Sequence, residues 1–197
     1  MRPNIILINC DDLGYGDLGC YGSSKNSTPF IDKMSDEGIR FTDFYVPSPV
    51  CSPSRGALLT GCYPKRIGFA SFDSRGLPYR STVLFPGDPE GLNPDELTIA
   101  KLLKSVGYTT KMIGKWHCGD QKEFLPTKHG FDTYLGLPYS NDMGIQELDD
   151  DYPPLPLIQN DDVISSQPDQ SLLTDLYTEE ALSFIEESKD EPFFLYF

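Results

Sequence analysis

Residues 51–55 read Cys-Ser-Pro-Ser-Arg and are followed directly by an apolar segment. This pattern predicts a helix that begins at the pentapeptide. Pro53 suits the first turn, where the N–H that proline lacks would have no helical acceptor, and Gly61 suits the position just past the helix end. Cys51 then lies at the helix entrance and shares a face with Arg55, one turn later. Such a place favours an anion, because backbone N–H groups and a guanidinium meet there. The alternative is a small buried cysteine beside a surface arginine.

The chain of 197 residues is acidic, with a formal net charge of −14 at pH 7. Its 39% hydrophobic content is enough for one sizeable core, so we expect a globular protein. The negative charge disfavours nucleic acid and anionic membrane surfaces as partners, because both bind basic patches. It does not exclude a small anionic substrate, since a metal ion and a few basic residues can concentrate positive charge at one spot.

Five cysteines are spread along the chain without a Cys-x-x-Cys pair, which fits neither a zinc site nor a dense disulfide scaffold. No apolar run reaches the length that a membrane span requires, so we expect no span. No basic and then apolar leader precedes the first predicted strand. Either the protein is cytoplasmic or a leader has been removed, and the compartment is left open.

Asp11 and Asp12 follow a short apolar run at residues 4–8, which is rich in β-branched side chains. The run predicts a central strand buried on both faces, and open α/β sheets bind their ligands at the carboxyl ends of such strands. Calcium or magnesium would suit this pair, because both prefer oxygen ligands and would offset the repulsion between the carboxylates. The pair predicts a metal site, with a solvated turn as the alternative.

Lys115 and His117 flank Trp116 just after a strand predicted at 108–114. In an extended segment, residues two apart project to the same side, so the lysine and the histidine would share one face while Trp116 turns to the other. The alternative is ordinary surface chemistry at the end of a strand.

Strands and helices alternate along the rest of the chain, which indicates an α/β fold with a mostly parallel sheet and helices on both faces. The helix that opens at Thr28 and closes at Gly38 would place Ile31 and Met34 in the core. We expect surface loops at 63–93 and 143–170. Further strands are predicted at 39–46 and 193–197, and a further helix at 93–107, with its acids in the first turn. The pattern at 171–187 predicts another helix whose inward residues are Tyr177, Ala181, Phe184 and Ile185.

These motifs together resemble the signature segments of the type I sulfatases. The sequence at 51–55 matches Cys-x-Pro-x-Arg, in which the cysteine of that family is oxidised after translation to formylglycine. Residues 11–17 resemble the family's Asp-Asp-x-Gly-x-Gly-Asp opening. Residues 114–117 match its Gly-Lys-Trp-His segment, although Cys118 replaces the leucine that follows, a change expected to affect packing more than chemistry.

The resemblance implies an alkaline-phosphatase-like fold and hydrolysis of sulfate monoesters. The substrate would be a sulfated small molecule or a sulfated glycan. Formylglycine made from Cys51 by a formylglycine-generating enzyme would be the nucleophile. By the same resemblance Asp11, Asp12 and residue 51 would bind the divalent metal, calcium or else magnesium. Members of the family are often secreted, periplasmic or lysosomal.

The resemblance also implies the remaining catalytic roles. Arg55 and Lys115 would neutralise negative charge on the nucleophile and the sulfate oxygens, and His117 would accept a proton. Segments at 128–132 and 136–142 look like the branch that contains arylsulfatase A and N-acetylgalactosamine-6-sulfatase. Within the second segment, Ser140 is a candidate substrate contact together with Lys115. A turn-forming serine is the alternative.

The sequence ends inside the predicted strand at 193–197, which is apolar on both faces. A buried strand normally continues into a surface loop, so we expect residues 1–197 to be the amino-terminal part of a single sulfatase catalytic domain. The fragment alone would then be inactive. Two other functions remain open, a phosphonate or phosphate monoester hydrolase of the same superfamily and a non-catalytic interaction module.

Overall fold

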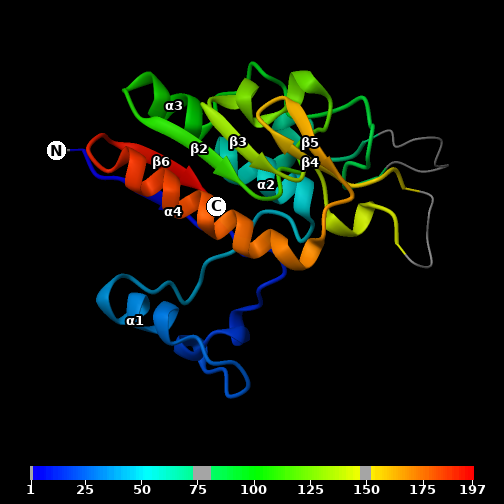
Figure 1. Cartoon of the computed structure of the whole chain (residues 1–197). Helices are drawn as coiled ribbons and strands as arrows, with labels where there is room; N and C mark the ends of the chain where they lie inside the picture. Colours follow the sequence, from blue (N-terminus) through cyan, green and yellow to red (C-terminus); the bar gives the residue numbers. More distant parts are fainter. Residues whose placement is uncertain (1, 73–80, 147–151) are drawn as a thin grey trace. The chain divides into compact units, whose positions relative to one another are not determined.

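The computed structural model describes residues 2–72, 81–146 and 152–197 (Figure 1). The chain divides into two compact units. Met1–Ile8 and Pro47–Phe197 form the larger one, which we call the sheet unit, and Asn9–Val46 forms the small unit. None of the helices formed by the described residues has the length and apolar character that crossing a membrane requires.

The sheet unit is built around six strands in the order β1-β6-β2-β3-β4-β5. The first four strands in this order run parallel to one another: β1 (Ile5–Leu7), β6 (Phe193–Tyr196), β2 (Thr109–Ile113) and β3 (Thr133–Gly136). Each of the last two is antiparallel to the strand before it: β4 (Pro156–Gln159) and β5 (Asp162–Ser166). The predicted mostly parallel sheet is therefore confirmed.

The β4–β5 hairpin corrects the expectation of a surface loop at 143–170, of which residues 147–151 lie outside the described residues. Proline is tolerated at the first position of a strand, and Pro156 opens β4 in this way. Leu155 and Leu157 on either side of it are buried in a core cluster. A few apolar residues within a proline-rich stretch were enough to add two strands to the sheet.

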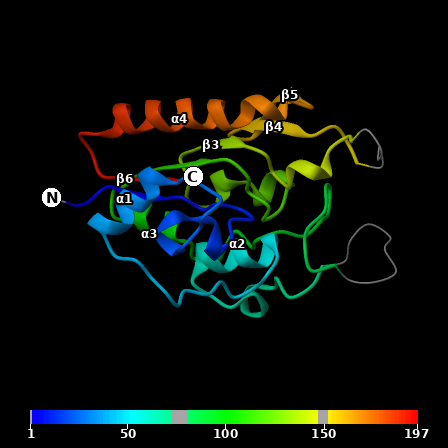
Figure 2. The same cartoon turned by 90° about the horizontal axis from the view of Figure 1, so that it is seen from below.

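Helices cover both faces of the sheet, as predicted. Figure 2 shows α4 along one face and α2 and α3 on the other. Their bounds are α2 (Cys51–Thr60), α3 (Ile99–Ser105) and α4 (Leu173–Ser188). Ala181 and Phe184 of α4 are buried, as the pattern at 171–187 predicts.

β6 shows why the sheet needs both layers of helices, because side chains alternate between the two faces of a strand. Phe193 and Leu195 pack in the cluster that contains α4, whereas Phe194 and Tyr196 pack in the larger cluster on the other face. All four residues are buried. The prediction of a buried strand at the end of the sequence is confirmed.

β1 differs from its prediction as a central strand buried on both faces. Among the strands that the structure describes, it lies at the edge of the sheet and pairs with β6 alone, so Ile6 is 47% exposed. The apolar pattern is that of a strand with neighbours on both sides. Strand order is set by tertiary pairing, which periodicity does not report.

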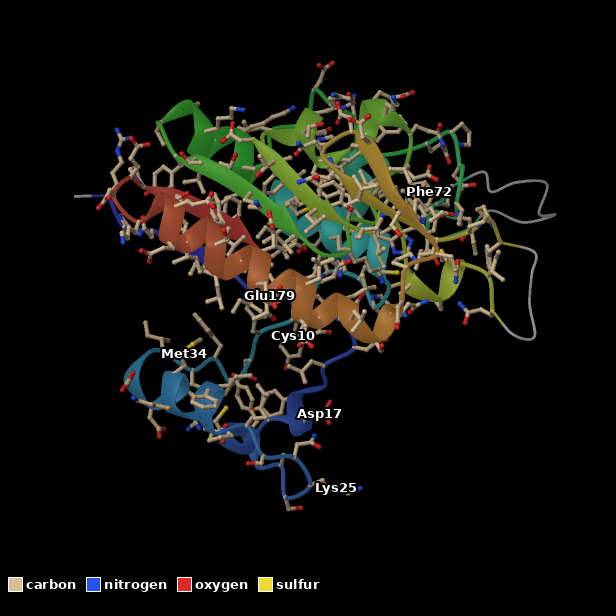
Figure 3. All side chains as sticks on the ribbon, in the orientation of Figure 1. Cys10, Asp17, Lys25, Met34, Phe72 and Glu179 are labelled. Atoms are coloured by element: carbon tan, nitrogen blue, oxygen red, sulfur yellow. The ribbon has the colours of Figure 1, made fainter. Side chains whose placement is uncertain are left out.

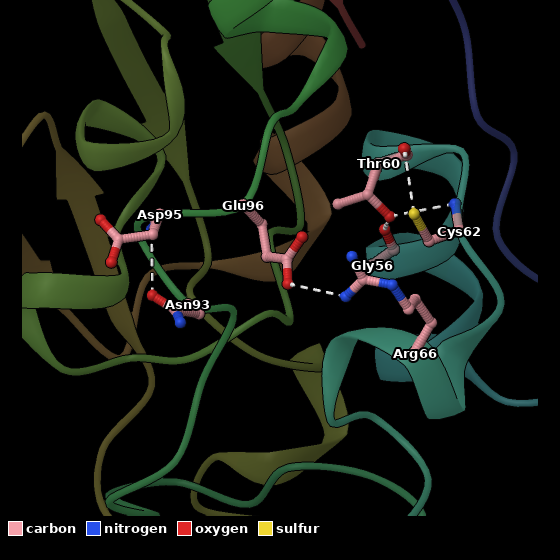
Figure 4. Close-up of polar contacts among 7 residues, drawn as sticks. All are labelled: Gly56, Thr60, Cys62, Arg66, Asn93, Asp95 and Glu96. Carbon is pink, nitrogen blue, oxygen red and sulfur yellow. Dashed lines mark hydrogen bonds and ion pairs between the residues drawn. The ribbon is translucent and has the colours of Figure 1, made fainter.

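The helix predicted at 93–107 begins later than expected, at Ile99, the first residue of α3. The side chain of Thr98 caps it by accepting a hydrogen bond from the N–H of Lys101 at 3.1 Å. Figure 4 shows the preceding turn, where the N–H of Asp95 donates to the side-chain oxygen of Asn93 at 2.9 Å. Asparagine favours such local turns over helix, so the acids at 95–96 lie in the turn and not in the helix.

In the small unit, helix α1 (Pro29–Glu37) begins after Thr28 and ends at Gly38, as predicted. Ile31 and Met34, which were expected in the core, are exposed, Met34 to 66%. The small unit has several other exposed apolar side chains (Figure 3). Residues 39–46 do not form the predicted strand. A strand needs a hydrogen-bonded neighbour, and this segment pairs with none of the strands formed by the described residues.

His129 is buried in the core of the sheet unit, and the centroid of its ring lies 5.3 Å from the ring centroid of Trp116. Burial, together with the positive charge of Lys101, lowers the pKa of His129 to about 3. A hydrogen bond to the backbone of Phe124 acts in the opposite direction and raises the pKa, but by less. The ring is therefore neutral in the folded protein at neutral pH. Unfolding would restore the ordinary pKa of 6.5 and let the ring take up a proton.

We expect His129→Gln to reduce the acid sensitivity of the fold. The unfolded state binds this proton below about pH 6.5 and the folded state only near pH 3, so stability is lost as the pH falls between these values, by up to ~1.4 kcal/mol per pH unit. Chemical denaturation of the full-length protein at several pH values measures the slope. An equal slope for wild type and variant would show that His129 is not the group responsible.

Candidate active site

The site is built on the amino-terminal end of α2. Cys51 is its first residue and Pro53 lies in its first turn, as the sequence predicts. Val50 precedes the helix in an extended conformation and offers no side-chain cap. The backbone N–H groups at this end give it partial positive charge, and Cys51 lies beside them, half-buried.

Arg55 lies one turn after Cys51 on the same helix face. It is only 6% exposed, so the alternative of a surface charge is wrong. Its guanidinium donates a hydrogen bond to the backbone carbonyl of Lys115 at 2.5 Å. A buried cation is costly unless it is hydrogen-bonded, so this bond fixes Arg55 and ties α2 to the segment that follows β2.

The other end of the site is an extension of the sheet beyond β2 and β3. The N–H groups of Gly114, Trp116 and His117 donate to the carbonyls of residues 135, 137 and 138 at 2.8 to 3.0 Å. The pairing carries Lys115 to the vicinity of Ser140, and the ammonium donates to the Ser140 hydroxyl at 3.3 Å. Two residues that the resemblance singled out therefore contact one another.

His117 is buried, which rules out the surface alternative for this residue. Its ring atom Nε2 lies 2.9 Å from the carbonyl oxygen of Leu84. Strand alternation does not set the direction of its side chain as expected, because Gly114 and His117 both have positive φ, 105° and 57°. Trp116 between them is buried and donates its ring N–H to the carbonyl of Phe124 at 2.8 Å.

Sequence reasoning missed two residues that contact this site. The hydroxyl of Ser52 is fully buried and accepts the N–H of Leu84 at 3.1 Å. Ser52 is the variable second position of the pentapeptide, and Leu84 lies in the stretch 63–93, which has little periodicity. In that stretch we expected only loop, and its residues 73–80 lie outside the described residues. The short apolar run at 83–85, in a stretch without periodicity, gives no signal of a role near a site.

Asp11 and Asp12 belong to the small unit, where they lie in an exposed turn and Asp12 has a φ of 62°. Within the part of the chain that the structure describes, no three His, Cys, Asp or Glu residues are grouped so as to hold a metal ion. The chemistry of the two exposed carboxylates nevertheless fits a hard divalent cation. Their role as metal ligands stays a prediction.

Cys118 is buried directly after the Lys-Trp-His segment. Burial raises the pKa of its thiol to about 12, the positive charge of Arg55 partly opposes this, and a negative charge on Cys51 adds to it. The thiol therefore stays protonated at neutral pH and packs as a small apolar group.

The match to the Sulfatase family model covers residues 3–197, and the chain belongs to the sulfatase family. It is 42% identical to human arylsulfatase A over 99% of this chain and 40% of that protein. It is 39% identical to rat N-acetylgalactosamine-6-sulfatase over 98% of this chain and 38% of that protein. The chain thus spans about two fifths of the length of these relatives.

The crystal structure of Ps i-CgsB is similar over 100% of this chain and 44% of that one, with a TM-score of 0.80 and 35% sequence identity. The sulfatase family has the alkaline-phosphatase-like fold, so the fold that the motifs imply is confirmed. Family membership also implies a formylglycine residue and a divalent metal ion.

We expect alkylation by iodoacetamide near neutral pH to spare Cys118 and to modify Cys10, which is exposed. The reagent attacks the thiolate, which Cys118 forms only near its raised pKa of about 12. Peptide mass spectrometry of the native full-length protein gives the extent of labelling at each cysteine. Rapid modification of Cys118 in the folded protein would contradict its buried, protonated state.

Proposed function

We propose that the full-length protein is a sulfuric ester hydrolase that cleaves sulfate monoesters of small molecules or glycans. The observation that carries the proposal is the bond from Arg55 to Lys115, which joins two family motifs that lie 60 residues apart. In the proposal, Arg55 and Lys115 supply positive charge at the end of α2 at which Cys51 lies. An anionic ester group is the kind of substrate that such a place would hold.

In the proposal, two groups complete the site. Formylglycine at position 51 would supply an oxygen nucleophile. A divalent ion, calcium or else magnesium, would supply the positive charge that lowers the pKa of that nucleophile. Asp11, Asp12 and residue 51 are the proposed metal ligands. A formylglycine-generating enzyme is the proposed partner in maturation.

The cationic side chains would stabilise negative charge in the transition state. Arg55 is held by its bond to the Lys115 carbonyl, and Lys115 is directed by its bond to the Ser140 hydroxyl. Groups that are already oriented need little rearrangement as charge develops on the sulfate oxygens. We propose that Lys115 binds the substrate sulfate and that Ser140 either contacts the substrate or orients this lysine.

His117 is the proposed general base. It is buried and fixed on one side by the carbonyl of Leu84, so its ring has a defined orientation. A fixed imidazole would accept the proton of the second hydroxyl of the hydrated residue 51. Sulfate would then leave as the bond from its oxygen to carbon breaks, and the aldehyde would form again.

After co-expression with a formylglycine-generating enzyme, we expect peptide mass spectrometry to show residue 51 as an aldehyde or its hydrate. Cys51→Ala should lower aryl sulfate turnover by roughly a thousandfold or more, because it removes the only proposed nucleophile. Unmodified cysteine in an active, native protein would contradict this mechanism, and unmodified cysteine without metal or activity would favour an interaction module. Kinetics on matched sulfate and phosphate esters would reveal a phosphate or phosphonate hydrolase.

We expect Asp12→Asn in the full-length protein to weaken calcium or magnesium binding by about tenfold or more, since it removes a charged oxygen ligand at nearly constant size. Calorimetric titration measures the affinity, and aryl sulfate turnover should fall in parallel. Asp17→Asn is the matched control, because Asp17 lies in the same segment and accepts the N–H of Gly14. Unchanged metal affinity in Asp12→Asn would support the alternative, in which Asp11 and Asp12 only form a solvated turn.

A further inference from the structure

Two hydrogen bonds connect the start of α2 to the proposed general base through a single residue. The hydroxyl oxygen of Ser52 accepts the N–H of Leu84 at 3.1 Å, and the carbonyl oxygen of Leu84 lies 2.9 Å from Nε2 of His117. All three residues are buried. Water therefore does not compete for these bonds, and each depends on the position of Leu84.

The second bond fixes the tautomer of His117. A carbonyl oxygen carries no hydrogen and can only accept, so Nε2 of the ring must donate. A neutral imidazole has one N–H and one lone pair, and with the hydrogen on Nε2 the lone pair is on Nδ1. Nδ1 is then the ring atom that can accept a proton.

The first bond holds the residue on which that tautomer depends. Residues 82–85 lie in neither a helix nor a strand, so no ladder of backbone bonds fixes Leu84. Neighbouring backbone groups are held by side chains in the same way, the N–H of Val83 by Ser81 and that of Phe85 by Asp88. Ser52 supplies this support for Leu84 from α2.

We propose that Ser52 is a positioning residue for the reaction. Through Leu84 it holds His117 as the Nε2–H tautomer and thereby assigns proton acceptance to Nδ1. This inference rests on the proposed function for its catalytic consequence, although the tautomer itself is a property of the fold. A purely structural Ser52 would only satisfy the N–H of Leu84, and its removal would change stability without changing the state of the ring.

The tautomer can be measured without any variant at Ser52. Long-range ¹H–¹⁵N correlation spectra of the full-length protein, labelled at histidine, distinguish the two neutral forms, and His117→Gln identifies the signals of His117. At a pH where the ring is neutral we expect the Nε2–H pattern. An Nδ1–H pattern would overturn the proposal, and this result does not depend on whether the protein hydrolyses sulfate esters.

Ser52→Ala tests the link between the serine and the ring. We expect a mixture of His117 tautomers and a fall in kcat of about ten- to a hundredfold with little change in KM, because a mispositioned base affects the chemical step. Ser52→Thr retains the hydroxyl and should restore both properties. Residue 51 is analysed by mass spectrometry in each variant, so that a loss of modification is not mistaken for a loss of positioning.

Thr60→Ala is the matched control on the same helix. The Thr60 hydroxyl donates to the carbonyl of Gly56 at 2.8 Å and accepts the N–H of Cys62 at 3.3 Å, contacts at the other end of α2 (Figure 4). We expect wild-type tautomer and kcat for this variant. An equal loss of kcat in Thr60→Ala, or a wild-type tautomer in Ser52→Ala, would overturn the positioning role. If Ser52→Ala does not fold, the wild-type tautomer and the Ser52→Thr kinetics decide.

Discussion

The hydrogen bond from the Arg55 guanidinium to the Lys115 carbonyl is the contact on which the candidate site depends. One partner lies on α2 and the other on the extension of the sheet beyond β2, so the bond joins a helix of one layer to the sheet itself. Because Arg55 is buried, removal of this acceptor would leave its charge with fewer partners in a poorly solvated place. This cost favours the arrangement in which the bond is kept, and cationic groups that are already oriented are what the proposed function requires.

The layers around that bond follow from simple alternation. In β6 the odd-numbered residues face α4 and the even-numbered residues face the larger core cluster. Burial of both faces leaves the strand ends as the places where polar groups can gather. Lys115 and His117 follow β2, and Ser140 follows β3. Because these two strands run parallel, all three residues lie at the same end of the sheet, beyond the carboxyl ends of the strands.

Much of this could be predicted from the sequence, because local signals were strong at particular residues. Pro53 and Gly61 gave the bounds of α2, Thr28 and Gly38 those of α1, and the inward residues of α4 followed from helical periodicity. Predictions failed where a partner decides the outcome. The run at 4–8 is as apolar as a central strand but pairs on one side only, and residues 39–46 have strand composition without a neighbouring strand.

The sequence by itself determined that Cys51 begins a helix with Arg55 one turn later, since helix start signals and the four-residue spacing are local properties of the chain. Its motifs also determined the family. Only the tertiary structure decided that Arg55 is buried against Lys115, that Ser140 receives the lysine, and that Leu84 lies between Ser52 and His117. These contacts join residues 25 to 60 positions apart, or pass through a segment without periodicity, and such long-range pairings arise from packing that no local pattern encodes.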